Sequence, residues 1–90
     1  SPYSMLALAQ VGQALQASFT GNWIGVTRQL MQGVVWYTLG NPAFLTKMLG
    51  SPKLTKSLEI LSNKTVPTGM KALNAGRNIY EAMQVEQGGQ

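Results

Sequence analysis

Glu59, Glu81 and Glu86 are the only side-chain carboxylates in this sequence of 90 residues, which contains no His, Cys or Asp. General acid–base catalysis at neutral pH uses a histidine or a pair of carboxylates whose pKa values are held apart. The spacing of the three glutamates is not typical of metal ligands. The sequence therefore predicts that this segment is not an enzyme and holds no metal or other cofactor.

Three serines are candidate nucleophiles for covalent catalysis. Ser51, Ser57 and Ser62 each lie near a lysine in the sequence, and a lysine amine can activate a serine hydroxyl. Ordinary surface residues of a helix explain the same pattern, so both interpretations stay open. No glycine-rich loop follows a predicted strand, and we expect no phosphate cradle and no small-molecule substrate.

Charged residues are few and unevenly distributed. They make up 11% of the chain, whereas about a quarter of an average soluble domain is charged. Arg28 is the single charge before Lys47, so Gln, Ser, Thr and Asn must supply the polar surface of the first half. A neutral polar surface is buried at lower cost than a charged one. We therefore expect partners to cover much of the first half, and the chain to be a piece of a larger helical assembly.

The second half is basic and gives the chain a net charge of +4 and a pI near 9.8. Lys53, Lys56 and Lys64 are candidates for non-specific contacts with DNA phosphates. The basic residues are spread over positions 47–77, and no aromatic residue lies between them. A solvated helix face explains the same charges, so DNA contact is one of two open interpretations.

Apolar periodicity predicts two long helices in the first half. The first segment, residues 1–18, and the residue after it carry apolar side chains at spacings of three and four, namely Leu8, Val11, Leu15 and Phe19. Residues 22–39 carry two adjoining stripes, Trp23, Val26, Leu30, Val34 and Tyr37 in one, and Ile24, Met31, Val35 and Leu39 in the other. The segment 34–38 has strand propensity by itself, but the helical period of the whole segment outweighs it. Residues 1–40 are thus expected to form a charge-poor helical hairpin.

A helix-start signal occurs twice, ten residues apart. Asn41 and Ser51 can accept hydrogen bonds from the free amides of a first helical turn, and Pro42 and Pro52 suit the first helical position. Gly50, between the two copies, is expected to end a helix in the left-handed conformation. The motif predicts two short helices, 42–49 and 52–63, within residues 41–64.

The remaining chain is expected to hold one more helix. Pro67 disfavours helix at the residue before it, so residues 65–69 are expected to form a linker. The last helix is expected over residues 70–84, followed by a flexible tail over 85–90. The prediction is an all-α fold of about five helices in one segment, residues 1–84, with two long N-terminal, two short central and one C-terminal helix.

Five residues of the first half are candidates for packing or membrane contacts. Gly21 and Gly25 have the GxxxG spacing of close helix–helix packing in membranes, but a Gly21 that ends the first helix explains its position more simply. Trp23, Trp36 and Tyr37 are of types that favour membrane interfaces. The uncharged runs are long enough to cross a bilayer but contain several polar residues. An interfacial helix and a helix buried in a protein assembly both stay open, and the second is favoured.

The doubled helix-start motif also resembles a known family. A Leu-rich helix, then Asn/Ser-Pro-x-Phe/Leu with Lys and a second apolar residue one turn on, then a Pro-containing break, resembles helical regions of the internal, DNA-ejection proteins of short-tailed phages. The similarity extends over about residues 28–83. The residues that carry it are Asn41, Pro42, Phe44, Lys47, Met48, Ser51, Pro52, Leu54, Lys56 and Leu58. Ser57 and Leu58 depart from the pattern, in which bulkier residues stand at these positions.

The resemblance implies a virion protein that is stored inside the capsid and reaches the host envelope during genome delivery. It implies no catalytic residue here, because any transglycosylase of such proteins lies elsewhere in the chain. The expected partners are other virion proteins and further copies of this chain, with a membrane surface and DNA as additional contacts. Two alternatives stay open: a stand-alone membrane-active amphipathic domain and a small basic DNA-packing domain.

Overall fold

The computed structural model of this protein describes residues 2–17, 21–63 and 69–88, which form five α-helices. They are α1 (Pro2–Ala17), α2 (Trp23–Gly40), α3 (Ala43–Leu49), α4 (Pro52–Ser62) and α5 (Met70–Gly88). No strand occurs among these residues, which confirms the predicted all-α fold of five helices. The strand-prone segment 34–38 lies inside α2, where its apolar side chains follow the helical period.

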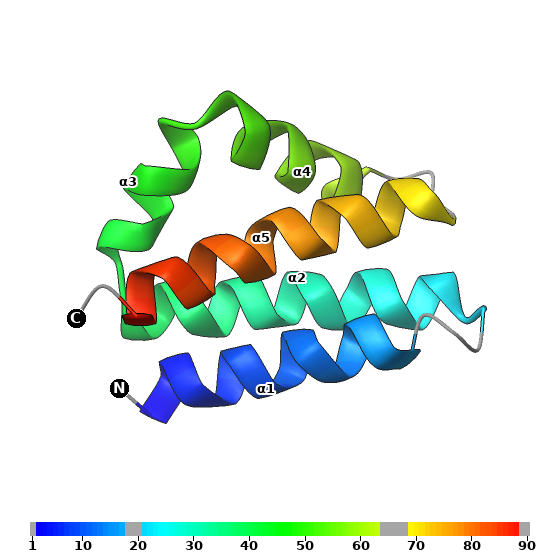
Figure 1. The fold of residues 1–90 in the computed structure, drawn as a ribbon, viewed down its shortest axis with the longest axis horizontal. Coiled ribbons are helices and arrows are strands. Elements are labelled where there is room, and N and C mark those ends of the chain that lie inside the picture. Colours follow the sequence, from blue (N-terminus) through cyan, green and yellow to red (C-terminus); the bar gives the residue numbers. More distant parts are fainter. Residues whose placement is uncertain (1, 18–20, 64–68, 89–90) are drawn as a thin grey trace.

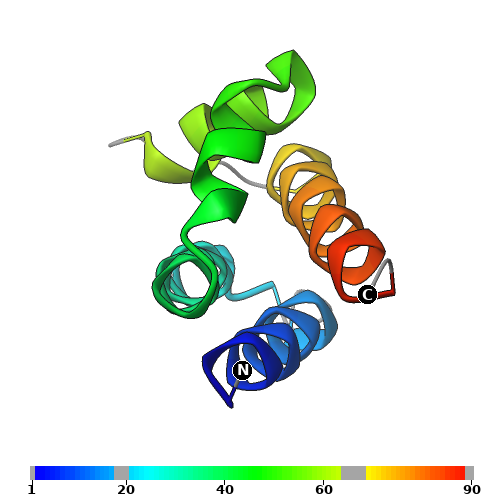
Figure 2. The same cartoon turned by 90° about the vertical axis from the view of Figure 1, so that its left-hand side faces the viewer.

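Helices α1 and α2 form an antiparallel hairpin, and α5 runs along it in the direction opposite to α1 (Figure 1). Seen end-on, α1, α2, α4 and α5 lie around a common centre, and α3 connects α2 to α4 at one end of the molecule (Figure 2). The radius of gyration is 12.0 Å, which matches the value of about 12 Å for a compact chain of this length. One cluster of buried apolar side chains contains residues from all five helices, so each helix contributes to a shared core.

Helix α1 packs on α2 through small residues rather than through its leucines. The buried residues of α1 are Ser4, Ala7, Val11 and Ala14. Leu8 and Leu15, which were expected to lead the apolar stripe, are only partly buried. Gly33 of α2 lies so close to Val11 that a Cβ atom at residue 33 would collide with the valine methyl Cγ2. Bulky side chains would hold the two backbones apart. The face of α1 that carries small residues is therefore the one that packs against α2. Phe19 lies outside the described residues.

The two predicted helix starts differ in the structure. At α4, Ser51 Oγ accepts a 3.3 Å hydrogen bond from a backbone amide one turn on, and Pro52 occupies the first turn, as predicted. At α3, Pro42 is the N-cap and no side chain caps the helix, so the prediction for Asn41 is wrong. Asn41 instead ends α2, where its amide donates to the Thr38 carbonyl at 3.2 Å. Asn41 has φ −152° and ψ 76°, whereas Ser51, which caps α4, has φ −109° and ψ 116°.

The prediction of a left-handed Gly50 is also wrong. Gly50 ends α3 in the right-handed region, with φ −83° and ψ −7°. The turn into α4 is held by Thr55, whose Oγ1 donates to the Met48 carbonyl at 3.0 Å, so no left-handed residue is needed. Left-handed glycines occur instead at Gly21 (φ 77°) and Gly69 (φ 57°), which precede α2 and α5. Apart from Gly69, the predicted linker 65–69 lies outside the described residues.

Helix α5 extends four residues beyond its expected end at residue 84, to Gly88, so the predicted tail begins too early. Its last turn is held by α2, because the hydroxyl of Tyr37 donates to Glu86 Oε1 at 3.1 Å and accepts from Gln87 Nε2 at 2.9 Å. Tyr37 is fully buried and packs edge-on against Phe44, with ring centroids 4.6 Å apart. The contact of Tyr37 with the end of α5 joins residues far apart in the chain, so the local sequence pattern does not predict it.

Candidate interaction surface

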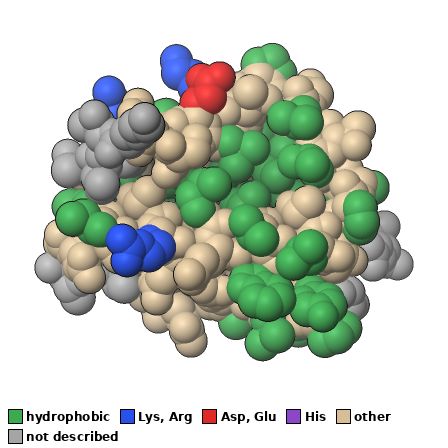
Figure 3. All heavy atoms as spheres, turned by 180° about the vertical axis from the view of Figure 1, so that it is seen from behind, with side chains coloured by type: hydrophobic (Ala, Val, Ile, Leu, Met, Phe, Trp, Pro, Cys, Tyr) green, Lys and Arg blue, Asp and Glu red, His purple; other side chains and the backbone are tan. Residues whose placement is uncertain are grey.

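The apolar side chains that α2 directs away from the core are exposed on one face of the molecule. Of the two predicted stripes, the one containing Leu30 and Tyr37 faces the core. In the other stripe, Val35 and Leu39 are 54% and 62% exposed, and the adjacent Trp36 is 42% exposed. Figure 3 shows this face, across which hydrophobic side chains extend while charged side chains lie along its upper and left parts. Large contiguous apolar patches on soluble proteins usually mark interaction sites.

Helices α1 and α3 extend this surface on either side of α2. Tyr3 of α1 stacks on Trp36, with ring centroids 5.7 Å apart and planes inclined by 9°. Leu6 of α1 lines a hollow together with Trp36, and Leu45 of α3 lines another together with Val35. All of these side chains are exposed. We call the surface formed by Tyr3, Leu6, Val35, Trp36, Leu39 and Leu45 the neutral apolar face.

A groove follows α2 on the side of α3 and α4, and we call it the α2–α4 groove. Its volume is about 370 Å³, and seven of its nine lining residues are apolar, among them Met31 and Leu58. The two polar residues are Thr38 and Ser62, whose hydroxyls donate to backbone carbonyls of their own helices at 2.7 Å and 3.4 Å. Because seven of the nine lining residues are apolar and none is charged, the groove presents a mainly apolar surface to an occupant.

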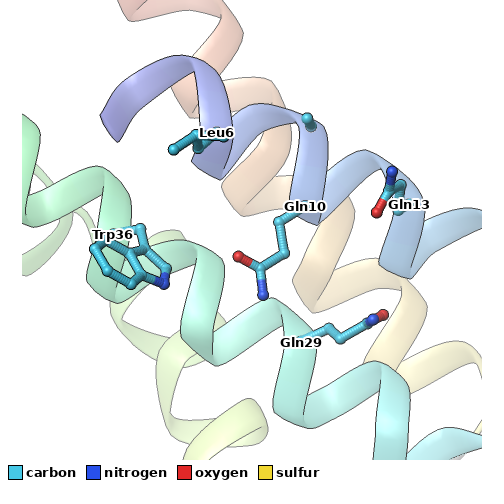
Figure 4. Close-up of a pocket in the computed structure, with 6 residues that line it drawn as sticks. Leu6, Gln10, Gln13, Gln29 and Trp36 are labelled. Carbon is cyan, nitrogen blue, oxygen red and sulfur yellow. The ribbon is translucent and has the colours of Figure 1, made fainter. Parts of the chain in front are cut away.

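A second hollow lies on the other side of α2, against α1 (Figure 4). It has a volume of about 400 Å³ and is lined by Leu6, Ala9, Gln10, Gln13, Gln29 and Trp36. Gln10 extends from α1 toward α2 between Trp36 and Gln29, and its amide donates to Gln32 Oε1 at 2.9 Å. These neutral amides give the apolar face a polar rim that carries no charge.

A single charge borders the neutral apolar face on its own helices. Arg28 lines a shallow hollow of about 420 Å³ along α2, together with Met31, Gln32, Val35 and others. No other charged residue occurs in α1 or α2. The charge-poor first half of the sequence therefore contributes Arg28 as the one charge of the α1–α2 hairpin.

Gly21 and Gly25 do not form the packing motif that their spacing predicts. Gly21 precedes α2 in a left-handed conformation, and a positive φ interrupts a helix, so the two glycines do not lie one turn apart on a helix face. Gly25 lies in the first turn of α2, where its amide donates to Asn22 Oδ1 at 3.2 Å as part of the N-cap. The close helix approaches occur at Gly33 and Gly76 instead.

The three predicted interface aromatics have different environments. Tyr37 is fully buried, and Trp23 is partly buried against the core, so both are packing residues. Trp36 remains at the surface, as part of the neutral apolar face. Within residues 2–17, 21–63 and 69–88, no helix combines the length and the hydropathy that a bilayer-spanning segment needs.

The serines considered as nucleophiles have structural hydrogen bonds. Ser51 caps α4, and Ser62 Oγ donates to a carbonyl of α4. Ser57 is buried between α4 and α5, where its Oγ donates to the Lys53 carbonyl at 2.9 Å and accepts from Asn78 Nδ2 at 3.2 Å. In the described part of the chain, no three His, Cys, Asp or Glu side chains come together as a metal site.

The lysines considered for DNA contact lie on α4. Lys53 and Lys56 are both exposed. Residues three apart share one side of a helix, so the two amines can serve one phosphate backbone. Lys64 lies outside the described residues.

The neutral apolar face has no counterpart to compare it with. No family model, curated protein or solved structure matches this chain. Function must therefore be inferred from the surface itself. Sequence reasoning singled out Trp36 but did not place Tyr3, Leu6 or Leu45 at a site, and the low charge of the first half was the one signal that pointed to this region.

Proposed function

We propose that this protein is a non-enzymatic helical module that binds other protein subunits, further copies of itself included, through the neutral apolar face. The observation that carries the proposal is the grouping of six exposed apolar side chains on a face to which α1 and α2 contribute one charge, Arg28. Partly exposed side chains of this size present on the order of 500 Å² of apolar surface in total. Covering that area would contribute on the order of 10 kcal/mol before the cost of association.

The setting that we propose is the virion of a short-tailed phage. The support is the resemblance of the doubled motif at Asn41-Pro42 and Ser51-Pro52 to internal virion proteins. A charge-poor helical module suits a protein that packs among other virion proteins inside the capsid and reaches the host envelope with the DNA. We expect peptides of this chain in purified particles of the phage that encodes it, and their loss from particles that have ejected their genome. Their absence from purified particles would rule the setting out.

Sedimentation of the chain over a range of concentrations tests the association itself. We expect wild-type protein to associate as its concentration rises, and Leu39→Glu to remain monomeric because it places a charge in the neutral apolar face. Met70→Glu is the matched control, since Met70 is exposed to the same degree as Leu39 but lies at the start of α5. A wild-type chain that stays monomeric at every concentration would contradict the proposed function.

A lipid surface is the second candidate partner of the same face. Tyr3 and Trp36 form an exposed stacked pair, and amphipathic aromatic rings favour the membrane interface. Binding to vesicles would shift the tryptophan emission of Trp36 to the blue, and leakage of vesicle contents would favour a membrane-active domain. DNA packing has weaker support, because the exposed pair Lys53 and Lys56 offers about two phosphate contacts and the affinity depends on their number.

A further inference from the structure

We infer that the neutral apolar face pairs with the same face of a second copy of this chain, about a two-fold axis close to Val35. In this arrangement the two α2 helices cross, and each exposed ridge of Val35 and Leu39 lies in the α2–α4 groove of the other copy. The inference rests on the proposed self-association and specifies the surface and the symmetry through which it occurs.

The shape of the face is the first argument. A two-fold contact uses the same patch on both subunits, so that patch must be complementary to itself. Here an exposed ridge and a groove of about 370 Å³ lie side by side, and Val35 and Leu39 belong to both. Helices pack when the side-chain ridge of one enters a groove of the other. One copy can therefore supply the ridge and accept the ridge of its partner at the same time.

The chemistry of the groove is the second argument. The hydroxyls of Thr38 and Ser62 already donate to backbone carbonyls, and the other seven lining residues are apolar. An apolar ridge thus enters without leaving a buried donor unpaired, which would cost free energy. A phosphate would find no charged side chain among the residues that line the groove. The α2 ridge of a second copy satisfies this requirement.

Area and charge are the third argument. A standard interface buries about 800 Å² on each partner. The apolar side chains of the face supply on the order of 500 Å², and the neutral rim that includes Gln10 and Gln32 borders them on the α1 side. Each copy has a net charge of +4, and Arg28 is the one charge that α1 and α2 bring to the contact. Repulsion between the other charges is screened at physiological ionic strength, so added salt should not dissociate the pair.

Disulfide trapping tests the position of the axis. The chain contains no cysteine, so a single introduced cysteine can pair only with its copy in another chain. A residue near a two-fold axis lies close to its mate, within the Cα separation of about 4.4–6.8 Å that a disulfide needs. We expect Val35→Cys to form a covalent dimer on mild oxidation. Asn74→Cys, at an exposed position of α5, is the matched control and should stay monomeric.

A charge at the same position provides an independent measurement. Val35→Glu should raise the dimer dissociation constant by at least about a hundredfold, because it buries an unpaired carboxylate in the contact, whereas Asn74→Glu should leave it unchanged. A wild-type dimer that Val35→Glu does not weaken, together with no Val35→Cys disulfide, would overturn this arrangement but not self-association. A wild-type monomer that binds phosphatidylglycerol vesicles with a blue shift in tryptophan emission would overturn both.

Discussion

The side-chain amide of Gln87 donates a 2.9 Å hydrogen bond to the hydroxyl oxygen of Tyr37, fifty residues earlier in the chain. The hydroxyl hydrogen of Tyr37 is in reach of the Met83 carbonyl at 3.3 Å and the Glu86 carboxylate at 3.1 Å. Three residues of α5 thus meet one buried phenol of α2. This contact joins the end of the last helix to the core, and it explains why α5 continues to Gly88.

Replacing Tyr37 with Phe should loosen the end of α5. The variant keeps the buried ring but removes the hydrogen bonds to Met83, Glu86 and Gln87, so we expect a loss of about 1–2 kcal/mol in the free energy of unfolding. Amide hydrogen exchange over residues 84–88 should become faster. Tyr80→Phe is the control and should change stability by less than about 0.5 kcal/mol. Unchanged exchange in Tyr37→Phe would show that the phenol does not hold this turn.

Tyr37 also makes stability depend on alkaline pH. Burial of the phenol raises its pKa above the ordinary value of 10.0; the Gln87 hydrogen bond opposes this rise, and the charge of Glu86 adds to it. The unfolded chain therefore loses this proton at a lower pH than the folded chain does. The contribution of Tyr37 to stability is complete below about pH 10 and is lost as the pH rises above that value. Urea unfolding at several alkaline pH values should show a steeper decline for wild type than for Tyr37→Phe. Equal slopes would contradict this assignment.

The contact between Gly33 and Val11 should make residue 33 intolerant of any side chain. A Cβ atom at Gly33 would meet the Val11 methyl, so Gly33→Ala should force α1 and α2 apart and cost about 1–3 kcal/mol. Gly12→Ala is the matched control, because the nearest atom to its Cβ would be Tyr80 Oη at 3.7 Å, an ordinary contact. That variant should be neutral or more stable by up to about 1 kcal/mol, since alanine favours a helix. Thermal unfolding of the two variants would separate these effects, and equal stability would refute the close approach.

Thr27 is a further site where substitution should change stability. Its Oγ1 is buried in α2 and has no hydrogen-bond partner among the described residues. Replacing a lone buried hydroxyl with a methyl group removes its desolvation cost, so Thr27→Val should raise the free energy of unfolding by about 1 kcal/mol. Thr27→Ser keeps the hydroxyl, removes the methyl group and should lower stability. If chemical denaturation finds Thr27→Val less stable than wild type, the hydroxyl must have a partner in solution.

The local sequence predicted the elements of this fold well where the signal acts over one or two turns. The Ser51-Pro52 start of α4 was predicted because a cap and a proline act on the amides next to them. The same signal failed at Asn41, where the backbone angles differ from those of Ser51 and no side chain caps α3. The lack of charge before Lys47 also pointed to an uncharged surface, since that property needs no knowledge of contacts.

Only the tertiary structure decided which side of each helix is buried. Both stripes of α2 are apolar, and the neighbouring α1 and α5 determine that Leu30 faces the core while Val35 faces solvent. The same packing buries Tyr37 and leaves Trp36, the adjacent residue, at the surface. The sequence by itself thus determined five helices and a charge-poor half. The neutral apolar face forms because residues distant in the chain pack together. The free energy of that packing depends on tertiary contacts, which a local sequence pattern does not encode.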